Sequence, residues 1–414
     1  MTRGQGDKGM GRQGDKETGR QGEYKMHIAE RLGNLPPYVF ATIGRQVRAL
    51  QEKGVDVIRL DIGNPDLPPP PAVVETLCRS AQDAHNHGYG GFFGKPALRE
   101  AIADYYGRRF GVELDPEGEV LPLIGSKEGI FHLPMAFVDP GDVVLAPDPG
   151  YPTYRVSTQL VGGELYLMPL LAENGFLPDL DAIPGDVLAR ARVLWLNYPN
   201  NPTTAMAPFS FLTEAVDFAR AHNLLLAHDN PYAETAWDSY VPPSLLQVSG
   251  AREVAVEFNS LSKTYHMAGW RVGAVVGNAE VIGALARLKT NVDSGIFRAV
   301  QDAAIVALST TDETWLVERN ETYRARRRVV AEALDRMGLA YVPSSATLYV
   351  WVRAPQGVAS ARFTSDLLSG DGVSLAPGTA FGSRGEGYVR ISLVQPVARL
   401  EEALARWERW MEEG

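Results

Sequence analysis

The feature that most constrains the fold is a repeated alternation of apolar or β-branched runs with helical or turn segments through the middle of the chain. Strands that alternate with helices in this way usually pair in parallel, with the helices packed over the sheet. The sequence therefore predicts an α/β fold with a largely parallel sheet. The expected strands are residues 120–124, 143–146, 164–168, 193–197, 224–229, 254–259 and 273–277.

The length of the chain predicts more than one domain. A chain of 414 residues with 45% hydrophobic residues exceeds one ordinary core and can fill two. Helices are expected over residues 40–53, 96–110 and 313–337, and the last of these leads into a smaller α/β unit. We expect a large domain over residues 71–312 and a small C-terminal domain over residues 313–414.

The first 25 residues differ from the rest of the chain. They are rich in glycine and charge, and the run Gln-Gly-Asp-Lys occurs at residues 5–8 and again at 13–16. Such a composition cannot form a core. We expect residues 1–25 to be a disordered tail or an extension from a misassigned start codon.

The net charge and the single cysteine indicate which partners and which cellular location this protein is expected to have. A net charge of −10 argues against a nucleic-acid or membrane-surface role, because either needs a clustered positive field. The basic run at residues 324–328 has acids around it and predicts a solvated helix face. The single cysteine, Cys78, excludes an internal disulfide and is expected to be a buried, inert thiol. With no signal-peptide pattern and no long apolar run, we expect a cytoplasmic protein acting on a small substrate.

A lysine among hydroxyl groups follows the predicted strand 254–259. Lys263 comes directly after Ser260 and Ser262, and Arg271 lies eight residues further on. A desolvated lysine amine is a nucleophile towards an aldehyde. The serines and the arginine supply donors and positive charge for a dianionic phosphate. Aldehyde and phosphate together indicate pyridoxal phosphate, although a solvated polar turn is the alternative.

Two further strand ends carry polar residues that suit this cofactor. Ser126 and Lys127 open a helix after a strand, where free N–H groups bind phosphate, unless this is an ordinary turn. Asp229 ends an apolar strand and needs a cationic partner, which a protonated pyridine ring would supply. That ring is the electron sink of the cofactor. A helix cap is the alternative for Asp229.

Four other residues have candidate roles around the ring and the substrate. Asn201 and Tyr232 can donate to the phenolic oxygen, and Tyr151 can stack on the ring; each could instead be an ordinary turn residue. Arg390, in an apolar strand, needs an anion. A substrate α-carboxylate is the functional candidate, and an ion pair within the domain is the alternative.

With these motifs in order, the chain from Met26 onward resembles the class I/II aminotransferases of pyridoxal phosphate fold type I. The resemblance implies a seven-stranded sheet in the large domain, and a small domain that includes residues 26–70. It implies that Lys263 forms a Schiff base with the cofactor and carries the proton, with Asp229 and Tyr232 as the other catalytic residues. The implied cofactor ligands are Lys263, Ser126, Lys127, Tyr151, Asn201, Asp229, Tyr232, Ser260, Ser262, Arg271 and Tyr89.

The resemblance also implies assembly and substrate contacts. Tyr89 matches a tyrosine that the neighbouring subunit contributes to the phosphate, which implies a homodimer with shared active sites. Phe92, on the same loop, would reach the substrate of the partner. The implied substrate-binding residues are Arg390, Gly63, Asn201, Tyr38, Lys127, Asn291 and Phe92.

Within the family the chain is most similar to the LL-diaminopimelate aminotransferases and near relatives. Residues 35–40, 125–129, 197–202 and 289–295 carry this likeness. Thr204 and Ala346 depart from usual glycines, Asn230-Pro231 replaces small residues, and Phe92 stands where plant-type enzymes have a glutamate that reads the distal ammonium group.

The resulting functional prediction is transfer of an amino group from an amino acid to a 2-oxo acid, as in lysine biosynthesis from LL-diaminopimelate with 2-oxoglutarate. Lys127 and Asn291 could pair with a distal carboxylate, so a dicarboxylic donor is expected. The alternatives are an aspartate, alanine or aromatic aminotransferase, a β-lyase on the same fold, or a non-enzymatic domain that senses pyridoxal phosphate.

Overall fold

The computed structural model describes residues 26–33, 35 and 37–413. Residues up to Leu35 form one unit, in which the short helix α1 (Glu30–Gly33) is described, and residues from Pro36 onward form a second unit. The tail predicted over residues 1–25 lies outside the described residues. No helix in the described part of the chain is both long enough and apolar enough to cross a membrane.

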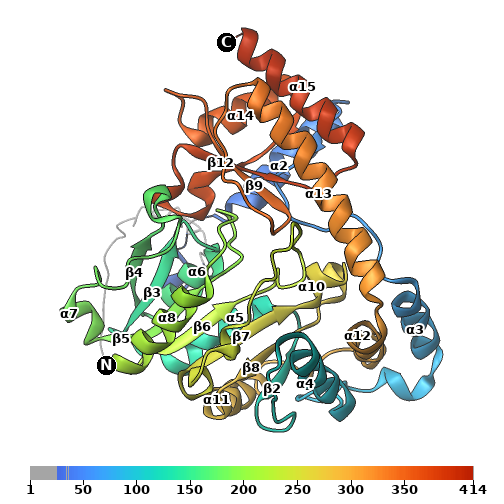
Figure 1. Ribbon diagram of the computed structural model, residues 1–414, viewed down its shortest axis with the longest axis vertical. Helices are drawn as coiled ribbons and strands as arrows, with labels where there is room; N and C mark the ends of the chain where they lie inside the picture. The colour runs from blue at the N-terminus through green and yellow to red at the C-terminus, as the bar shows by residue number, and fades with distance from the viewer. Residues whose placement is uncertain (1–25, 34, 36, 414) are drawn as a thin grey trace, which may run out of the picture. The chain divides into compact units, whose positions relative to one another are not determined.

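A seven-stranded sheet forms the centre of the second unit, in the order β2-β8-β7-β6-β5-β3-β4 (Figure 1). All neighbouring strands pair in parallel except β8, which runs antiparallel to both β2 and β7. The predicted α/β fold with a largely parallel sheet is therefore confirmed. The strands are β2 (Val120–Leu123), β3 (Val143–Asp148), β4 (Glu164–Pro169), β5 (Ala191–Leu196), β6 (Leu225–Asp229), β7 (Ala255–Ser260) and β8 (Gly273–Gly277).

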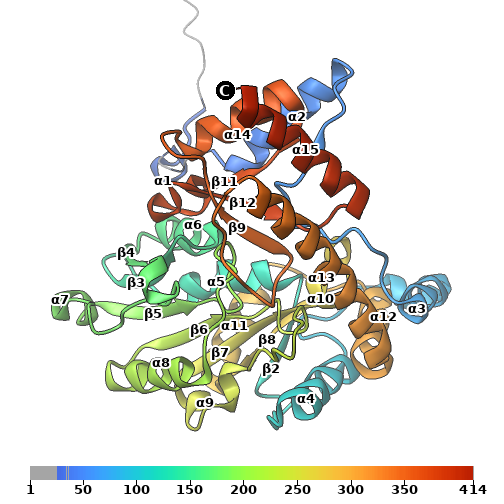
Figure 2. The same ribbon diagram turned by 45° about the horizontal axis from the view of Figure 1, so that its top comes forward.

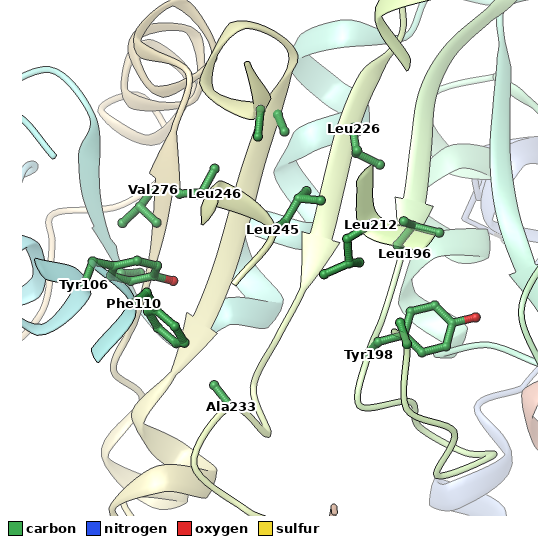
Figure 3. Close-up of a cluster of buried hydrophobic side chains, with 14 of the residues drawn as sticks. Tyr106, Phe110, Leu196, Tyr198, Leu212, Leu226, Ala233, Leu245, Leu246 and Val276 are labelled. Carbon is green, nitrogen blue, oxygen red and sulfur yellow. The ribbon is translucent and has the colours of Figure 1, made fainter. Parts of the chain in front are cut away.

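Helices cover both faces of this sheet, which explains why the strands read as continuous apolar runs. Successive residues of β5 alternate between two cores: Val193 and Trp195 face one, and Leu194 and Leu196 face the other. Figure 3 shows the second core, with Leu196, Leu226 and Val276 on the strands. The first core includes residues of α5 (Ser126–Phe137), α6 (Pro152–Leu160) and α11 (Ala279–Lys289). The second includes residues of α3 (Pro71–Gln82), α4 (Pro96–Phe110), α8 (Phe209–Ala221) and α12 (Arg298–Thr310). Three short helices complete this part: α7 (Gly185–Leu188), α9 (Ala251–Val254) and α10 (Leu261–Thr264).

A smaller group of elements, drawn mostly in orange and red, lies beside the seven-stranded sheet (Figures 1 and 2). Its own core includes Phe363, Leu400 and Trp407. Its sheet has the order β11-β12-β9, and β1 pairs in parallel with β10, so an early strand joins the C-terminal third of the chain. Whether the boundary predicted after residue 312 separates two domains stays a prediction. The elements are α2 (Val39–Glu52), β1 (Ile58–Arg59), α13 (Glu313–Arg336), β9 (Tyr349–Arg353), α14 (Ser360–Asp371), β10 (Val373–Ser374), β11 (Ala376–Pro377), β12 (Tyr388–Ser392) and α15 (Val397–Glu413).

Two expectations from the sequence are wrong. The basic run on α13 is only partly solvated: Arg326 is buried and donates from Nη1 and Nη2 to the two carboxylate oxygens of Asp66 at 2.7 Å each. This bidentate pair ties α13 to the segment that leads into the cavity described below. Cys78 is exposed rather than buried, because α3 buries the face that carries Val73 and Thr76.

Candidate active site

A cavity of about 410 Å³ lies where β5, β6 and β7 end. The carboxyl ends of parallel strands share one edge of a sheet, and ligand sites of α/β folds form there. Most of the residues predicted from the sequence meet in this cavity. These are Tyr38, Gly63, Ser126, Lys127, Tyr151, Asn201, Asp229, Tyr232, Ser260, Ser262, Lys263, Arg271 and Arg390.

Lys263 projects into the cavity from α10, directly after β7. The hydroxyl of Ser260 caps this short helix by accepting from the N–H of Ser262 at 3.3 Å. The amine of Lys263 donates to the main-chain oxygen of Gly63. Burial lowers the pKa of Lys263; Tyr349 opposes this shift, and the charges of Arg390 and Arg271 add to it. A lysine held in this way is suited to nucleophilic attack on an aldehyde.

Asp229 is the last residue of β6, and one of its oxygens has no donor. Oδ2 accepts from the hydroxyl of Tyr154 at 2.6 Å, whereas Oδ1 is buried without a hydrogen-bond partner among the described residues. Burial raises the pKa of Asp229 from 3.8 to about 6, against the effect of the Tyr154 hydrogen bond. A buried carboxylate oxygen that lacks a donor fits the protonated nitrogen of a pyridine ring.

Asn201 lies on the turn after β5, and Arg390 orients its side-chain amide. Its Oδ1 accepts from Nη1 of Arg390 at 2.6 Å, so its N–H₂ group remains available for another acceptor. Asn197 holds the turn in place, because its Oδ1 accepts from the N–H of Asn201 at 2.8 Å and its Nδ2 donates to the main-chain oxygen of Asp229 at 2.6 Å. An amide donor on this side of the cavity suits a phenolate oxygen.

Glycines allow close approach where Arg271 meets the start of α5. Gly125 precedes α5 with φ of 73°, and a Cβ there would collide with the guanidinium of Arg271. A Cβ on Gly273 would lie 2.8 Å from the main-chain nitrogen of Ser126. The helix N-terminus and the guanidinium therefore share one small space, which is the arrangement that binds phosphate.

Arg390 is buried inside a group of aromatic rings. Its guanidinium carbon lies 4.1 Å from the ring centre of Tyr349, 4.7 Å from that of Phe381 and 5.6 Å from that of Phe40. Its other partners are Asn201 and the main-chain oxygen of Asp61 at 2.8 Å, and its Nε has none among the described residues. The ion pair that was the alternative for Arg390 is therefore not formed within the described chain, and an anion can still bind.

The charge of the cavity favours anionic ligands. The described residues that line it include Lys127, Lys263, Arg271 and Arg390, but only one acid, Asp229. This set contains a partner for each reactive group of the cofactor. Arg271 suits the phosphate, Asp229 suits the ring nitrogen, and Lys263 suits the aldehyde. The residues therefore fit pyridoxal phosphate.

Three predicted residues do not line this cavity. Tyr89 and Phe92 have exposed fractions of 84% and 44%. Asn291 is exposed on the turn after α11, where its side-chain amide donates to the main-chain oxygen of Arg287 at 2.9 Å. The roles of Tyr89 and Phe92 were expected in the active site of a neighbouring subunit, so these roles stay predictions, as does a substrate contact for Asn291.

The structure also adds residues that sequence reasoning missed. Tyr154 stacks on Trp195 with ring centres 4.7 Å apart and donates to Asp229. Tyr349 lies 3.2 Å from the hydroxyl of Tyr232, oxygen to oxygen. Burial opposes ionisation of Tyr349, but Arg390 and Lys263 outweigh it and lower the pKa. Asn197 could have been found by the strand-end reasoning that found Asp229, whereas Tyr154 and Tyr349 depend on tertiary packing.

Comparison with known proteins agrees with this site. The family described as aminotransferase class I and II matches residues 55–406. LL-diaminopimelate aminotransferase of Dehalococcoides mccartyi is 49% identical over 92% of this chain and 98% of that protein, and its namesake from Aquifex aeolicus is 50% identical over 91% and 97%. The solved structure of apo-BacF from Bacillus subtilis, 38% identical, superposes with a TM-score of 0.90 over 93% of this chain and 98% of that one. The chain therefore belongs to the class I and II aminotransferases, and it is a transaminase that uses pyridoxal phosphate.

Proposed function

We propose that this aminotransferase takes its amino group from a dicarboxylic amino acid, with LL-diaminopimelate as the main donor and 2-oxoglutarate as the acceptor. Support comes from the relatives named LL-diaminopimelate aminotransferase, which match more than nine tenths of the chain at about half identity. Such an enzyme would serve lysine biosynthesis.

One observation supports a dicarboxylic donor in particular. If Arg271 binds phosphate and Arg390 binds the α-carboxylate, Lys127 is the cation that remains, besides the nucleophile Lys263, among the described residues that line the cavity. Its amine lies 5.2 Å from the ring centre of Tyr38 and 5.9 Å from that of Tyr151. Partial burial lowers the pKa of Lys127, and Arg271 adds to this effect. A second carboxylate on the substrate would relieve this repulsion between the two cations.

Each residue has a role in this proposal. Pyridoxal phosphate supplies an aldehyde for the amine and a ring that withdraws electrons from the substrate α-carbon. Lys263 would hold that aldehyde through Nζ, since burial favours its neutral amine, and the same Nζ would carry the proton once the substrate amine has displaced it. Asp229 would accept from the ring nitrogen, Asn201 and Tyr232 would donate to the phenolic oxygen, and Tyr151 would stack on the ring. The phosphate ligands are Ser126, Ser260, Ser262 and Arg271, together with the main-chain N–H of Lys127, whose side-chain amine stays free for the substrate.

Substrate binding divides between the two ends of the donor. Arg390 binds the α-carboxylate through its planar fork, and the rings of Phe40, Tyr349 and Phe381 fix the plane of that fork. Gly63 lies close by, because a Cβ there would overlap the hydroxyl of Tyr349. Tyr38 and Lys127 meet the far end of the side chain.

A panel of donors tests the substrate. The enzyme loaded with pyridoxal phosphate is mixed with LL-diaminopimelate, glutamate, aspartate, alanine and phenylalanine, and conversion to pyridoxamine phosphate is followed by absorbance with the keto acid identified. We expect the dicarboxylic donors to react fastest. A preference for alanine or phenylalanine over every dicarboxylate would contradict the substrate assignment. Release of pyruvate and ammonia from an added amino acid that carries a leaving group on its β-carbon would indicate a β-lyase.

We further propose a homodimer with shared active sites, acting in the cytoplasm, where a chain with one cysteine stays reduced. The exposed Tyr89 would bind the phosphate in the partner's cavity. Lys263→Ala and Tyr89→Phe chains, each shown to be severely impaired alone, are refolded together. Hybrid dimers should regain activity because one of their two sites is intact, whereas a fully active monomer in solution would contradict the proposal.

A further inference from the structure

A histidine and a glutamate are paired behind Asp229, on the neighbouring strands β6 and β7. His228 precedes Asp229 and lies opposite Glu257 in the sheet, and both side chains are fully buried. Nδ1 of His228 lies 2.9 Å from Oε2 of Glu257. Its Nε2 lies 3.1 Å from the main-chain oxygen of Tyr198.

These partners determine where the protons are. A main-chain oxygen only accepts, so Nε2 of His228 must carry hydrogen. The carboxyl group of Glu257 also accepts from Leu245 N–H at 2.8 Å, from the Tyr106 hydroxyl at 2.9 Å and from the Ser244 hydroxyl at 3.0 Å. Hydrogen bonds from several donors stabilise the ionised carboxylate. A carboxylate opposite Nδ1 then requires hydrogen on that nitrogen too.

His266 provides a contrast within the same molecule. Its Nδ1 lies 3.1 Å from the main-chain oxygen of Leu67, and its Nε2 lies 3.1 Å from the hydroxyl of Tyr323, which can donate. One nitrogen therefore donates while the other accepts, which is the pattern of a neutral ring. Burial lowers the pKa of His266 to about 4, and Arg319 adds to this effect.

We propose that His228 is an imidazolium with hydrogen on both ring nitrogens, ion-paired with Glu257, and that it is a positioning residue for the cofactor end of the active site. It would act in two ways, by holding the turn after β5 and by setting a fixed positive charge beside Asp229. The pair as a whole is neutral and its hydrogen bonds are satisfied, so its burial costs less than that of a lone charge.

The first action follows from the hydrogen bond to Tyr198. Tyr198 lies between Asn197 and the turn residue Asn201, so the imidazolium holds the main chain from which both asparagines project.

The second action follows because His228 is the residue directly before Asp229 in β6. Burial raises the pKa of Asp229, and the charge of His228 opposes this shift and favours the ionised carboxylate. This second action rests on the proposed role of Asp229 in holding the pyridine nitrogen.

The protonation state is measured directly by NMR of the apoenzyme. The chain has seven histidines, and selective ¹⁵N labelling of their rings, with assignment by His228→Gln, gives the protonation of each nitrogen. At pH 7 both nitrogens of His228 should carry hydrogen, whereas His266 should show one protonated and one bare nitrogen. Glu257→Gln keeps the hydrogen-bond acceptor but removes the charge, so one nitrogen of His228 should be bare in this variant under the same conditions.

Cofactor affinity tests the link to Asp229. At pH 7 Glu257→Gln should weaken the binding of pyridoxal phosphate about twofold, because the ionised fraction of Asp229 falls about twofold when its pKa rises by about one unit from about 6. Ser244→Ala is the matched control, because it removes one donor to Glu257 and leaves both charges. A bare ring nitrogen on wild-type His228 at pH 7 would overturn the proposal, and so would equal affinities of the two variants. If Glu257→Gln fails to fold, the wild-type spectrum still decides the protonation. Failure of the proposed role of Asp229 itself would appear separately, as unchanged cofactor affinity in Asp229→Asn.

Discussion

The two ends of the active-site cavity differ in how firmly this chain holds them. At the cofactor end, Asp229, Asn197 and Tyr154 are buried, and Asp229 accepts a hydrogen bond from each of the other two. At the outer end, Tyr38 has an exposed fraction of 46% and Ile62 of 37%, and Lys127 is exposed too. Buried hydrogen-bonded groups have one arrangement, whereas exposed side chains at a rim can adopt several.

This difference separates the reaction from its specificity. In the proposed mechanism amino-group transfer depends on the buried end, where the partner's Tyr89 adds only a contact to the phosphate. Recognition of the substrate side chain depends on the outer end, where residues of a partner subunit would also contribute in the proposed dimer. Substitutions at the buried end should therefore affect every donor equally, and substitutions at the outer end should change the ranking of donors.

The largest effect should come from Lys263→Ala. Loss of the amine removes both the covalent bond to the cofactor and the group that moves the proton, so kcat should fall on the order of 10⁴-fold or more for every donor. Turnover is measured with glutamate and LL-diaminopimelate, and borohydride reduction followed by peptide mapping locates the modified lysine. Lys127→Ala is the control, because it should keep the reducible bond. Normal activity in Lys263→Ala would remove the central assignment.

Asp229→Asn should have the next largest effect, again on every donor. The neutral amide cannot neutralise the charge of a protonated ring, so kcat should fall about 100-fold or more.

The same substitution should make the apoenzyme more stable, because it removes a buried carboxylate that has no ion-pair partner among the described residues. The folded-state pKa of about 6 lies above the ordinary 3.8, so the carboxylate destabilises the fold increasingly as pH rises from about 4 to 6. Above pH 6 this cost is up to about 3 kcal/mol.

Thermal melting of the two apoenzymes checks whether the Asp229 carboxylate destabilises the fold. Asp229→Asn should melt above the wild type at pH 8, and the difference should disappear near pH 4. The reverse order at pH 8 would show that Asp229 is not destabilising in the apoenzyme. Cofactor-loaded samples are the comparison, because a bound cation at Asp229 should remove the advantage of the amide.

The cofactor end could be predicted from the sequence because its residues follow recognisable elements. Asp229 and Lys263 lie at or just after strand ends, and Ser126 begins a helix. Parallel strands bring such ends to one edge, so local patterns were sufficient. Thr204 stands where a glycine is usual, and it adopts the left-handed conformation with φ of 62°, which glycine adopts more readily.

The remaining contacts could not be predicted because they join distant parts of the chain. Tyr154 reaches Asp229 across 75 positions, and Arg326 reaches Asp66 across 260. The sequence around Tyr154 or Arg326 does not indicate such a contact. Tyr154 is one tyrosine on a helix, and Arg326 is one arginine within a basic run. Arg390 was recognised as needing an anion, but the rings around it come from three separate segments.

Arg390→Lys should have an intermediate effect that still does not depend on the donor. Lysine keeps the charge but loses the planar fork, and a charged hydrogen bond contributes about 1.5–3 kcal/mol. KM should therefore rise about 10- to 100-fold for glutamate, aspartate and LL-diaminopimelate alike, with a smaller change in kcat. Steady-state kinetics with the three donors is the measurement. A change confined to one donor would place Arg390 at the side chain instead of the α-carboxylate.

The smallest effect should come from Phe92→Glu, and it alone should change the ranking of donors. LL-Diaminopimelate carries a distal ammonium group that glutamate lacks, and the apolar ring of Phe92 offers that group no partner. In the proposed dimer the new carboxylate would reach the partner's cavity and gain one charge-assisted hydrogen bond, about 1.4 kcal/mol. The ratio of kcat/KM for LL-diaminopimelate to that for glutamate should then rise about tenfold. Phe93→Glu is the matched control, since Phe93 is exposed to a similar extent, 47% against 44%, on the same loop. Equal shifts in the two variants would indicate a general charge effect, and no shift in either would mean that the loop does not contact the substrate.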